Sequence, residues 1–269
     1  MKGRKPLPVA ITIAGVDSGG GAGVAADLKT FAALGVHGAL AVTSLTAQNT
    51  VEVRAIQDLD PEMVEAQVEA VADDLGIDAG KTGMLSNESI IKAVARVVGK
   101  YGFPLVVDPV MIAKSGAKLL RDEAIKALID QLIPKAAVVT PNAPEASRLT
   151  GIDVKDLRTA REAAQAIVEE LGAEAAVVKG GHLSSEYSID VLYFRGDFEE
   201  FRAPRIDSGT THGTGCSFSA AIAAGLAKGL RVPEAVGEAK RFITEAIKYG
   251  LALGAGHGPV NPTAWVAIP

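Results

Sequence analysis

Short apolar runs alternate along the chain with segments whose apolar residues recur at helical spacing. After the first run, for example, Leu28, Phe31 and Ala32 fall on one face of a predicted helix. The runs predicted as strands are 9–14, 39–45, 77–81, 105–108, 137–140 and 175–179. The segments predicted as helices are 24–34, 61–74, 87–98, 123–132, 159–171, 215–228 and 232–249. Strands and helices that alternate in this way are typical of an α/β fold.

The predicted strands are continuous apolar runs, not runs in which apolar and polar residues alternate. Such strands are buried on both faces, which favours a mostly parallel central sheet between two layers of helices. Residues 191–194 and 199–203, separated by Arg195-Gly-Asp197, predict an antiparallel hairpin at the sheet edge. No linker or repeat interrupts the pattern. We therefore expect a three-layer α/β/α sandwich and a single domain over residues 1–269.

Polar or glycine-containing turns follow six of the predicted strands. In open α/β sheets ligands bind beyond the carboxyl ends of the strands. The turns are 15–23, Gln48-Asn49, Thr82-Gly-Met84, Asp108-Pro-Val110, Pro141-Asn142 and Lys179-Gly-Gly-His182. Their shared position predicts that they line one edge of the sheet and form a binding site there.

Composition narrows the class of protein. Of the 269 residues, 48% are hydrophobic, which is enough for a large core, and the net charge of −5 comes with no basic stripe for nucleic acid. No apolar run is long enough to cross a bilayer, and no signal-peptide layout is visible. The single cysteine, Cys216, excludes an intramolecular disulfide. We expect a cytoplasmic protein that binds neither nucleic acid nor membrane.

The segment Thr210-Thr-His-Gly-Thr-Gly-Cys216 stands directly before an apolar helix. Glycines at a helix start let bare amides converge, and the helix dipole favours anions there. This segment predicts an anion hole for the charge of a transferring phosphoryl group. A thiol in the first helical turn is expected to have its thiolate stabilised by the same field, which suits Cys216 to take a proton from a substrate hydroxyl.

Ordinary structural roles compete with these interpretations. A Gly-Thr-Gly sequence is often only a tight turn, and a lone cysteine is often a small buried hydrophobe. The glycine cluster at 19–23 lacks the Lys-Ser/Thr ending of a phosphate-binding P-loop. Asp108 and Glu145 could be turn or helix caps, and Met84 could belong to the core. No Cys/His spacing indicates zinc.

Taken together, the motifs resemble those of a known family. They are 12–23, 26–31, 46–50, 81–84, 108–116, 140–142 with Glu145, 179–182, 203–205 and 211–216. In this order they are similar to the hydroxymethylpyrimidine and phosphomethylpyrimidine kinases of thiamin biosynthesis, in the ribokinase superfamily, over nearly the whole chain. One departure is Ser18, which follows Asp17 where relatives often have a proline.

The resemblance implies a role for each matching residue, with ATP and Mg²⁺ as cofactors and a homodimer as the assembly. The anion hole is Gly213, Thr214 and Gly215, with Cys216 as the catalytic base. The residues around the pyrimidine are Gly15, Asp27, Gln48, Met84 and Val110. Those near the nucleotide are Asn142, Lys179, Thr211 and Lys114, and the anchors for Mg²⁺ are Asp108 and Glu145.

The implied activity is ATP-dependent phosphorylation of 4-amino-5-hydroxymethyl-2-methylpyrimidine, and of its monophosphate to the diphosphate. The Gln48 amide fits this substrate, because it can pair with a ring nitrogen and an exocyclic amine. Pyridoxal or pyridoxine kinase activity on the same scaffold is the nearest alternative. A non-catalytic sensor of pyrimidines or nucleotides is another, although Cys216, Asp108 and Glu145 together favour catalysis. A Rossmann dehydrogenase is disfavoured, since no acidic residue ends the second strand.

Overall fold

The computed structural model describes residues 7–113, 115–182 and 186–267, and its strands form one nine-stranded sheet. The strands are β1 Val9–Asp17, β2 His37–Gln48, β3 Val53–Asp58, β4 Ala79–Thr82, β5 Leu105–Val107, β6 Val138–Val139, β7 Ala175–Val178, β8 Tyr187–Phe194 and β9 Asp197–Pro204. Their order is β3-β2-β1-β4-β5-β6-β7-β8-β9. From β2 to β7 neighbours are parallel, whereas β3, β8 and β9 pair antiparallel.

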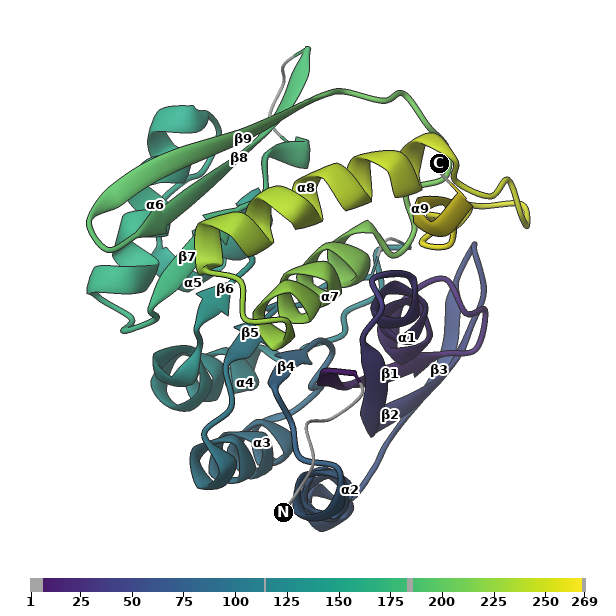
Figure 1. The fold of residues 1–269 in the computed structure, drawn as a ribbon, viewed down its shortest axis with the longest axis vertical. Coiled ribbons are helices and arrows are strands. Elements are labelled where there is room, and N and C mark those ends of the chain that lie inside the picture. Colours follow the sequence, from purple (N-terminus) through teal and green to yellow (C-terminus); the bar gives the residue numbers. More distant parts are fainter. Residues whose placement is uncertain (1–6, 114, 183–185, 268–269) are drawn as a thin grey trace.

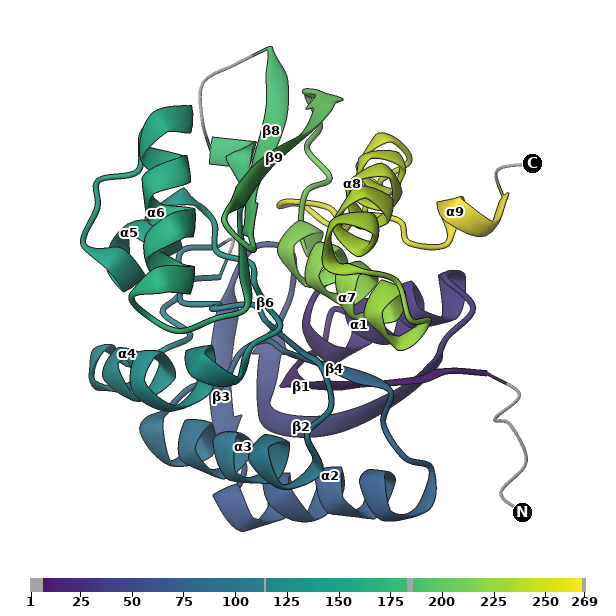
Figure 2. The same ribbon diagram turned by 60° about the vertical axis from the view of Figure 1, so that its left-hand side comes forward.

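Helices cover both faces of this sheet (Figures 1 and 2). They are α1 Gly23–Ala33, α2 Pro61–Asp74, α3 Glu88–Tyr101, α4 Asp122–Ala127, α5 Ala143–Thr150, α6 Leu157–Glu169, α7 Thr214–Ala227, α8 Val232–Lys248 and α9 Ala264–Ala267, with a π-helix η1 at Leu128–Leu132 and 3₁₀ turns η2 at Ile133–Lys135 and η3 at Gly180–His182. Helices α1, α7 and α8 pack on one face, and α2 to α6 on the other. The predicted three-layer sandwich with a mostly parallel sheet is confirmed.

The core is divided by the sheet into two apolar clusters. In β5, Val106 packs with α7 and α8, whereas Leu105 and Val107 pack with the helices of the other face. This alternation is the expected consequence of the two-residue period of a strand. The strand runs are continuous and apolar because each of their faces meets one of these clusters.

Local chemistry explains where several helices begin and end. The Asn87 side chain accepts a 3.0 Å hydrogen bond from the Ile90 amide, which caps α3, and Gly102 ends that helix at φ 68°. At α5, Asn142 and Glu145 form a reciprocal capping box.

Several elements differ from the sequence-based prediction. Strand β3 was not predicted, because its residues are mostly exposed and carry no buried run; it pairs antiparallel with β2 at the sheet edge. Helix α5 was not among the predicted helices, although Glu145 was considered a possible helix cap; Pro144 lies in its first turn, where a missing amide costs nothing. The predicted helix at 123–132 continues from α4 into the π-helix η1.

Among the described residues, no helix has both the length and the apolar character needed to cross a membrane.

Candidate active site

Polar side chains from neighbouring parallel strands project toward α7 at the carboxyl ends of those strands. Val106 of β5 packs beneath α7, so Asp108, two residues further on, faces the same side. The same alternation brings Thr140 after β6 and Lys179 after β7 to this side, and Lys81 of β4 is in register with Val106. The predicted gathering of polar strand ends is therefore present, and it lies under the first turn of α7.

An acid–lysine cluster occupies the centre of this edge. The Lys179 Nζ lies 3.0 Å from Asp108 Oδ1 and 4.0 Å from Glu145 Oε2. Burial would lower the pKa of Lys179, but the two carboxylates raise it, so the ammonium stays charged. Burial raises the pKa of Glu145 to about 7, with Lys179 opposing the shift and Asp108 reinforcing it. The cluster thus holds one firm positive charge between two buried acids.

Both predicted metal anchors, Asp108 and Glu145, belong to this cluster. Each is almost fully buried, and the Lys179 ammonium already lies between their oxygens as a cation does. Within the described part of the chain no group of three or more acidic, histidine or cysteine side chains could cage a metal. The donor set fits Mg²⁺ that is held mainly by nucleotide phosphates and water, since that ion uses few protein carboxylates.

The start of α7 presents unpaired amides beside the cluster. Gly213 caps the helix at φ 80°, and the Thr214 amide and hydroxyl both turn back to the Thr211 carbonyl, at 3.3 and 2.8 Å. The amides of Gly215 and Cys216 donate to no acceptor in the described regions. A Cβ added at Gly215 would lie 3.3 Å from Lys179 Nζ, so these amides open toward the acid–lysine cluster. Their geometry suits an anion hole.

Cys216 is partly exposed and is surrounded by charged groups, not by hydrocarbon alone. Burial raises the pKa of its thiol to about 11; Lys81 and the Gly23 amide lower it, while Asp27 and Asp108 raise it further. A thiol with this pKa is protonated at neutral pH. The sequence-based expectation that the helix start stabilises the thiolate stays a prediction, and burial, the largest influence on this pKa, acts against it.

A buried ion pair below Cys216 was not predicted. Asp27 Oδ2 accepts hydrogen bonds from Lys81 Nζ at 2.8 Å and from Thr12 Oγ1 at 2.6 Å, and both charged side chains have no exposed surface. Burial would lower the pKa of Lys81, but Asp27 raises it well above its ordinary value. Asp27 Oδ1 is buried and has no hydrogen-bond partner among the described residues. The predicted contact of Asp27 with the pyrimidine would have to use this oxygen.

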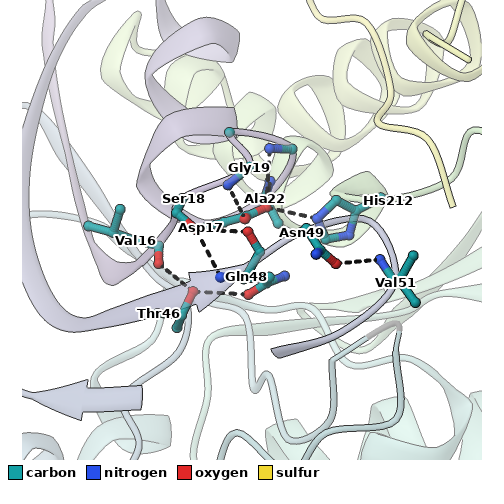
Figure 3. Close-up of polar contacts among 12 residues, drawn as sticks. Val16, Asp17, Ser18, Gly19, Ala22, Thr46, Gln48, Asn49, Val51 and His212 are labelled. Atoms are coloured by element: carbon teal, nitrogen blue, oxygen red, sulfur yellow. Dashed lines mark hydrogen bonds and ion pairs between the residues drawn. The ribbon is translucent and has the colours of Figure 1, made fainter. Parts of the chain in front are cut away.

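The other residues predicted around the pyrimidine come from several strand ends. Gly15 and Met84 are neighbours, because a Cβ at Gly15 would lie 3.1 Å from Met84 Sδ. Gln48, at the end of β2, is half-buried, and its Oε1 lies 3.1 Å from Thr46 Oγ1 (Figure 3). Val110 is also half-buried, directly after Asp108 and Pro109.

Three of the residues predicted near the nucleotide are Asn142, Lys179 and Lys114. Asn142 Oδ1 is already used, since it accepts from the Glu145 amide at 2.9 Å as the cap of α5. Lys179 and Asn142 are in register as an isolated parallel bridge, so the two do lie side by side. The predicted Lys114 lies outside the described residues.

Sequence reasoning missed the charged partners Lys81, Asp17 and His212. A signal was present for Lys81, because a lysine at the end of an otherwise apolar strand must either reach solvent or find an acid. Nothing local pairs Asp17 with His212, which is 195 residues away along the chain.

The fold and the site together define a small-molecule kinase of ribokinase-like architecture. A solved structure described as an ADP complex of Bacillus subtilis pyridoxal kinase matches with a TM-score of 0.89 and 42% identity, covering 96% of this chain and 98% of that one. A Clostridium difficile phosphomethylpyrimidine kinase matches with a TM-score of 0.79 and 42% identity, covering 89% and 99%.

Sequence comparison gives the family. Residues 17–261 match the family profile described as "Phosphomethylpyrimidine kinase". The hydroxymethylpyrimidine/phosphomethylpyrimidine kinase of Bacillus subtilis is 47% identical over 258 residues, covering 95% of both chains. The chain belongs to the phosphomethylpyrimidine kinase family, as its motifs predicted.

Proposed function

We propose that this chain transfers the terminal phosphoryl group of ATP to the hydroxymethyl group of 4-amino-5-hydroxymethyl-2-methylpyrimidine, and then phosphorylates the monophosphate to the diphosphate for thiamin biosynthesis. The observation that carries the proposal is the convergence of Cys216, the unpaired amides of Gly215 and Cys216, and the Asp108–Lys179 pair at one edge of the sheet. Phosphoryl transfer needs little covalent chemistry from the protein, and mainly positioning and charge stabilisation.

Each part of the site has a task in this reaction. Cys216 Sγ, in its thiolate form, takes the proton of the substrate hydroxyl. The amides at the start of α7 stabilise charge that develops on the transferring group. Lys179 neutralises the phosphate oxygens, which attract its ammonium as the carboxylates of Asp108 and Glu145 do. Gln48 orients the pyrimidine by its amide, while Met84 packs on the ring.

Mg²⁺ is part of this proposal. Asp108 and Glu145 would anchor it through water while the nucleotide phosphates supply the remaining oxygens. When bound, the ion neutralises charge on the β- and γ-phosphates. Removing divalent cations with a chelator should abolish turnover, and added Mg²⁺ should restore it.

The direct test is an assay of the purified protein with ATP and the hydroxymethylpyrimidine, following ADP and both phosphorylated products. We expect the monophosphate first and the diphosphate next. A second assay begins from purified monophosphate, and failure to form the diphosphate there would refute the second step.

Pyridoxal is the second candidate substrate, because a solved structure named as a pyridoxal kinase shares 42% identity with this chain. A hydroxymethylpyridine could meet the same thiol and the same amides. The two substrates should be compared at equal concentration in one preparation. A higher kcat/KM for pyridoxal would reverse the substrate assignment.

A homodimer in the cytoplasm completes the proposal. The dimer is expected from the resemblance to the family, and the strand edge at β3 leaves large apolar side chains such as Ile56 exposed. A cytoplasmic location agrees with a single cysteine and with substrates that are soluble metabolites.

A further inference from the structure

The glycine-rich loop after β1 binds a carboxylate of its own. Asp17 Oδ1 accepts from the Gly19 amide at 2.8 Å, and Oδ2 accepts from the Gly21 and Ala22 amides at 3.1 and 2.9 Å (Figure 3). Asp17 is only 5% exposed, and although burial raises its pKa, His212 and the Gly19 and Ala22 amides lower it below the ordinary value. The loop amides are thus occupied internally and do not face a phosphate.

The same carboxylate reaches the segment that caps α7. His212 Nε2 lies 2.8 Å from Asp17 Oδ2. A carboxylate only accepts, so Nε2 carries the proton that is shared. His212 directly precedes Gly213, the N-cap of α7, so it stands beside the first turn whose Gly215 and Cys216 amides suit an anion hole.

The two segments also touch through their backbones. A Cβ on Gly213 would lie 1.9 Å from the Gly21 carbonyl oxygen, and a Cβ on Gly21 would lie 2.4 Å from His212 Cδ2. Side chains are excluded at both positions. The loop and the start of α7 are therefore in direct contact, with one charge-assisted hydrogen bond that fixes their relative position.

The residue after Asp17 holds the opposite side of the site. Ser18 Oγ donates to the Gln48 carbonyl at 2.7 Å and accepts from the Gln48 amide at 2.8 Å. The Gln48 side chain is in turn close to Thr46 Oγ1, whose single proton is shared between the Val16 carbonyl at 2.8 Å and Gln48 Oε1 at 3.1 Å. Two consecutive residues of one loop thus contact the two halves of the site (Figure 3).

We propose that Asp17 and His212 are positioning residues, which set the distance between the pyrimidine held at Gln48 and the anion hole at the start of α7. The inference rests on the proposed function for the identity of the substrate. Neither side chain needs to touch substrate. A displacement of about 1 Å between reacting groups can cost on the order of a hundredfold in rate, so a tie of this kind acts on kcat.

The variants His212→Ala, His212→Gln and Ser18→Ala test separately the contact with the start of α7 and the contact with Gln48. Removing the histidine should lower kcat by about ten- to a hundredfold and change KM for the pyrimidine less than about threefold. Glutamine places an N–H near the position of Nε2, so His212→Gln should regain most of kcat. Ser18→Ala should mainly raise KM for the pyrimidine, because it releases Gln48. His37→Ala, at an exposed position at the opposite end of β2, is the control.

Several outcomes would overturn the proposal. These are a kcat for His212→Ala within twofold of the parent, equal losses in the alanine and glutamine variants, or parallel changes of kcat and KM. A purely structural role would lower the melting temperature of both histidine variants without the rescue.

A readout that needs no substrate keeps the proposal separate from the proposed function. Cys216 is the only cysteine, so its alkylation by iodoacetamide reports on the start of α7 alone. At pH 8, His212→Ala should react faster than the parent, and His212→Gln should return to the parent rate. Inactivity of the parent on both pyrimidines would refute the proposed function, whereas unchanged alkylation in His212→Ala would refute the positioning role.

Discussion

At the scale of single residues, the site is governed by charges that are buried without being fully neutralised. Lys81 and Asp27 have no exposed surface, and Asp108 is 2% exposed. Removing a charged group from water is costly unless neighbouring groups compensate. The charge state of each of these side chains therefore depends on the balance between burial and the charges beside it. Cys216 and Glu145 are the two residues at which this balance has the clearest measurable consequence.

For Cys216, we expect that reactivity and turnover rise with pH. Burial raises the pKa of the thiol to about 11, so the thiolate fraction should grow about tenfold for each pH unit between 7 and 10. Iodoacetamide alkylation of the single cysteine measures this directly. A rate that levels off near pH 8 would show that the thiol has an ordinary pKa.

The Cys216→Ala variant tests the role of the same side chain as a base. Turnover should fall by about two to four orders of magnitude, while binding of the pyrimidine, measured by calorimetry, stays within a few-fold. Unchanged turnover would remove Cys216 from the mechanism.

Glu145 should make the stability of the protein depend on pH. Its pKa in the folded state is about 7 against an ordinary 4.5, so its stabilising contribution is complete below pH 4.5 and is lost as the pH rises through 7. Glu145→Gln keeps an oxygen for the Asn142 amide and removes the buried charge. At pH 8 it should stabilise the fold by on the order of 3 kcal/mol, and at pH 4 by almost nothing.

Denaturant unfolding at both pH values measures the difference for Glu145→Gln. Turnover should fall in the same variant, because a neutral amide is a poorer anchor for Mg²⁺. Equal effects on stability at pH 4 and pH 8 would contradict the raised pKa.

At the scale of elements, Gly213 at the start of α7 must be a glycine for two reasons: its positive φ and its close contact with another loop. Gly213 has φ 80°, a region that side chains rarely adopt, and its Cα packs against the Gly21 carbonyl. That backbone conformation directs the amides of Gly215 and Cys216, which donate to no acceptor in the part of the chain that the structure describes. The motif was recognisable in the sequence, but the contact with Gly21 involves a loop about 190 residues earlier.

Two glycines at the ends of α7 allow these requirements to be separated. Gly229, just past the end of α7, also has positive φ, at 85°, but a Cβ there would meet nothing within 4 Å. Gly229→Ala should cost roughly 1–2 kcal/mol from backbone strain and leave kcat unchanged. Gly213→Ala adds a clash with Gly21 and should cost roughly 2–5 kcal/mol, with at least a tenfold loss of kcat. Similar unfolding energies for the two variants would show that the contact with Gly21 yields easily.

Element boundaries show what local pattern could and could not predict. The parallel strands and the long helices were predicted within a few residues, because buried runs and helical spacing are local signals. Strand β3 gave no such signal, since its stability comes from pairing with β2 and not from burial. Helix α5 was not among the predicted helices, and a proline such as Pro144 is compatible with both a turn and a first helical turn.

At the scale of the whole molecule, the sheet has an exposed edge at β3. Ile56 on β3 and Leu45 on β2 are 40% and 46% exposed. Uncovered apolar strand edges favour association, and the family resemblance also implies a dimer. Sedimentation equilibrium should give twice the 27.7 kDa mass of one chain at micromolar concentration. A single-chain mass over the whole concentration range would contradict this.

The sequence by itself determined the α/β class, the candidate site at the carboxyl ends of the parallel strands, and the family. These follow from periodicity, turn chemistry and short motifs, all of which are contained within a few neighbouring residues. Only the tertiary structure decided which charges meet. Asp108 and Lys179 are 71 residues apart, and Asp17 and His212 are 195 apart. Whether a thiol is a ready base depends on how deeply packing buries it, and burial is a property of the whole fold.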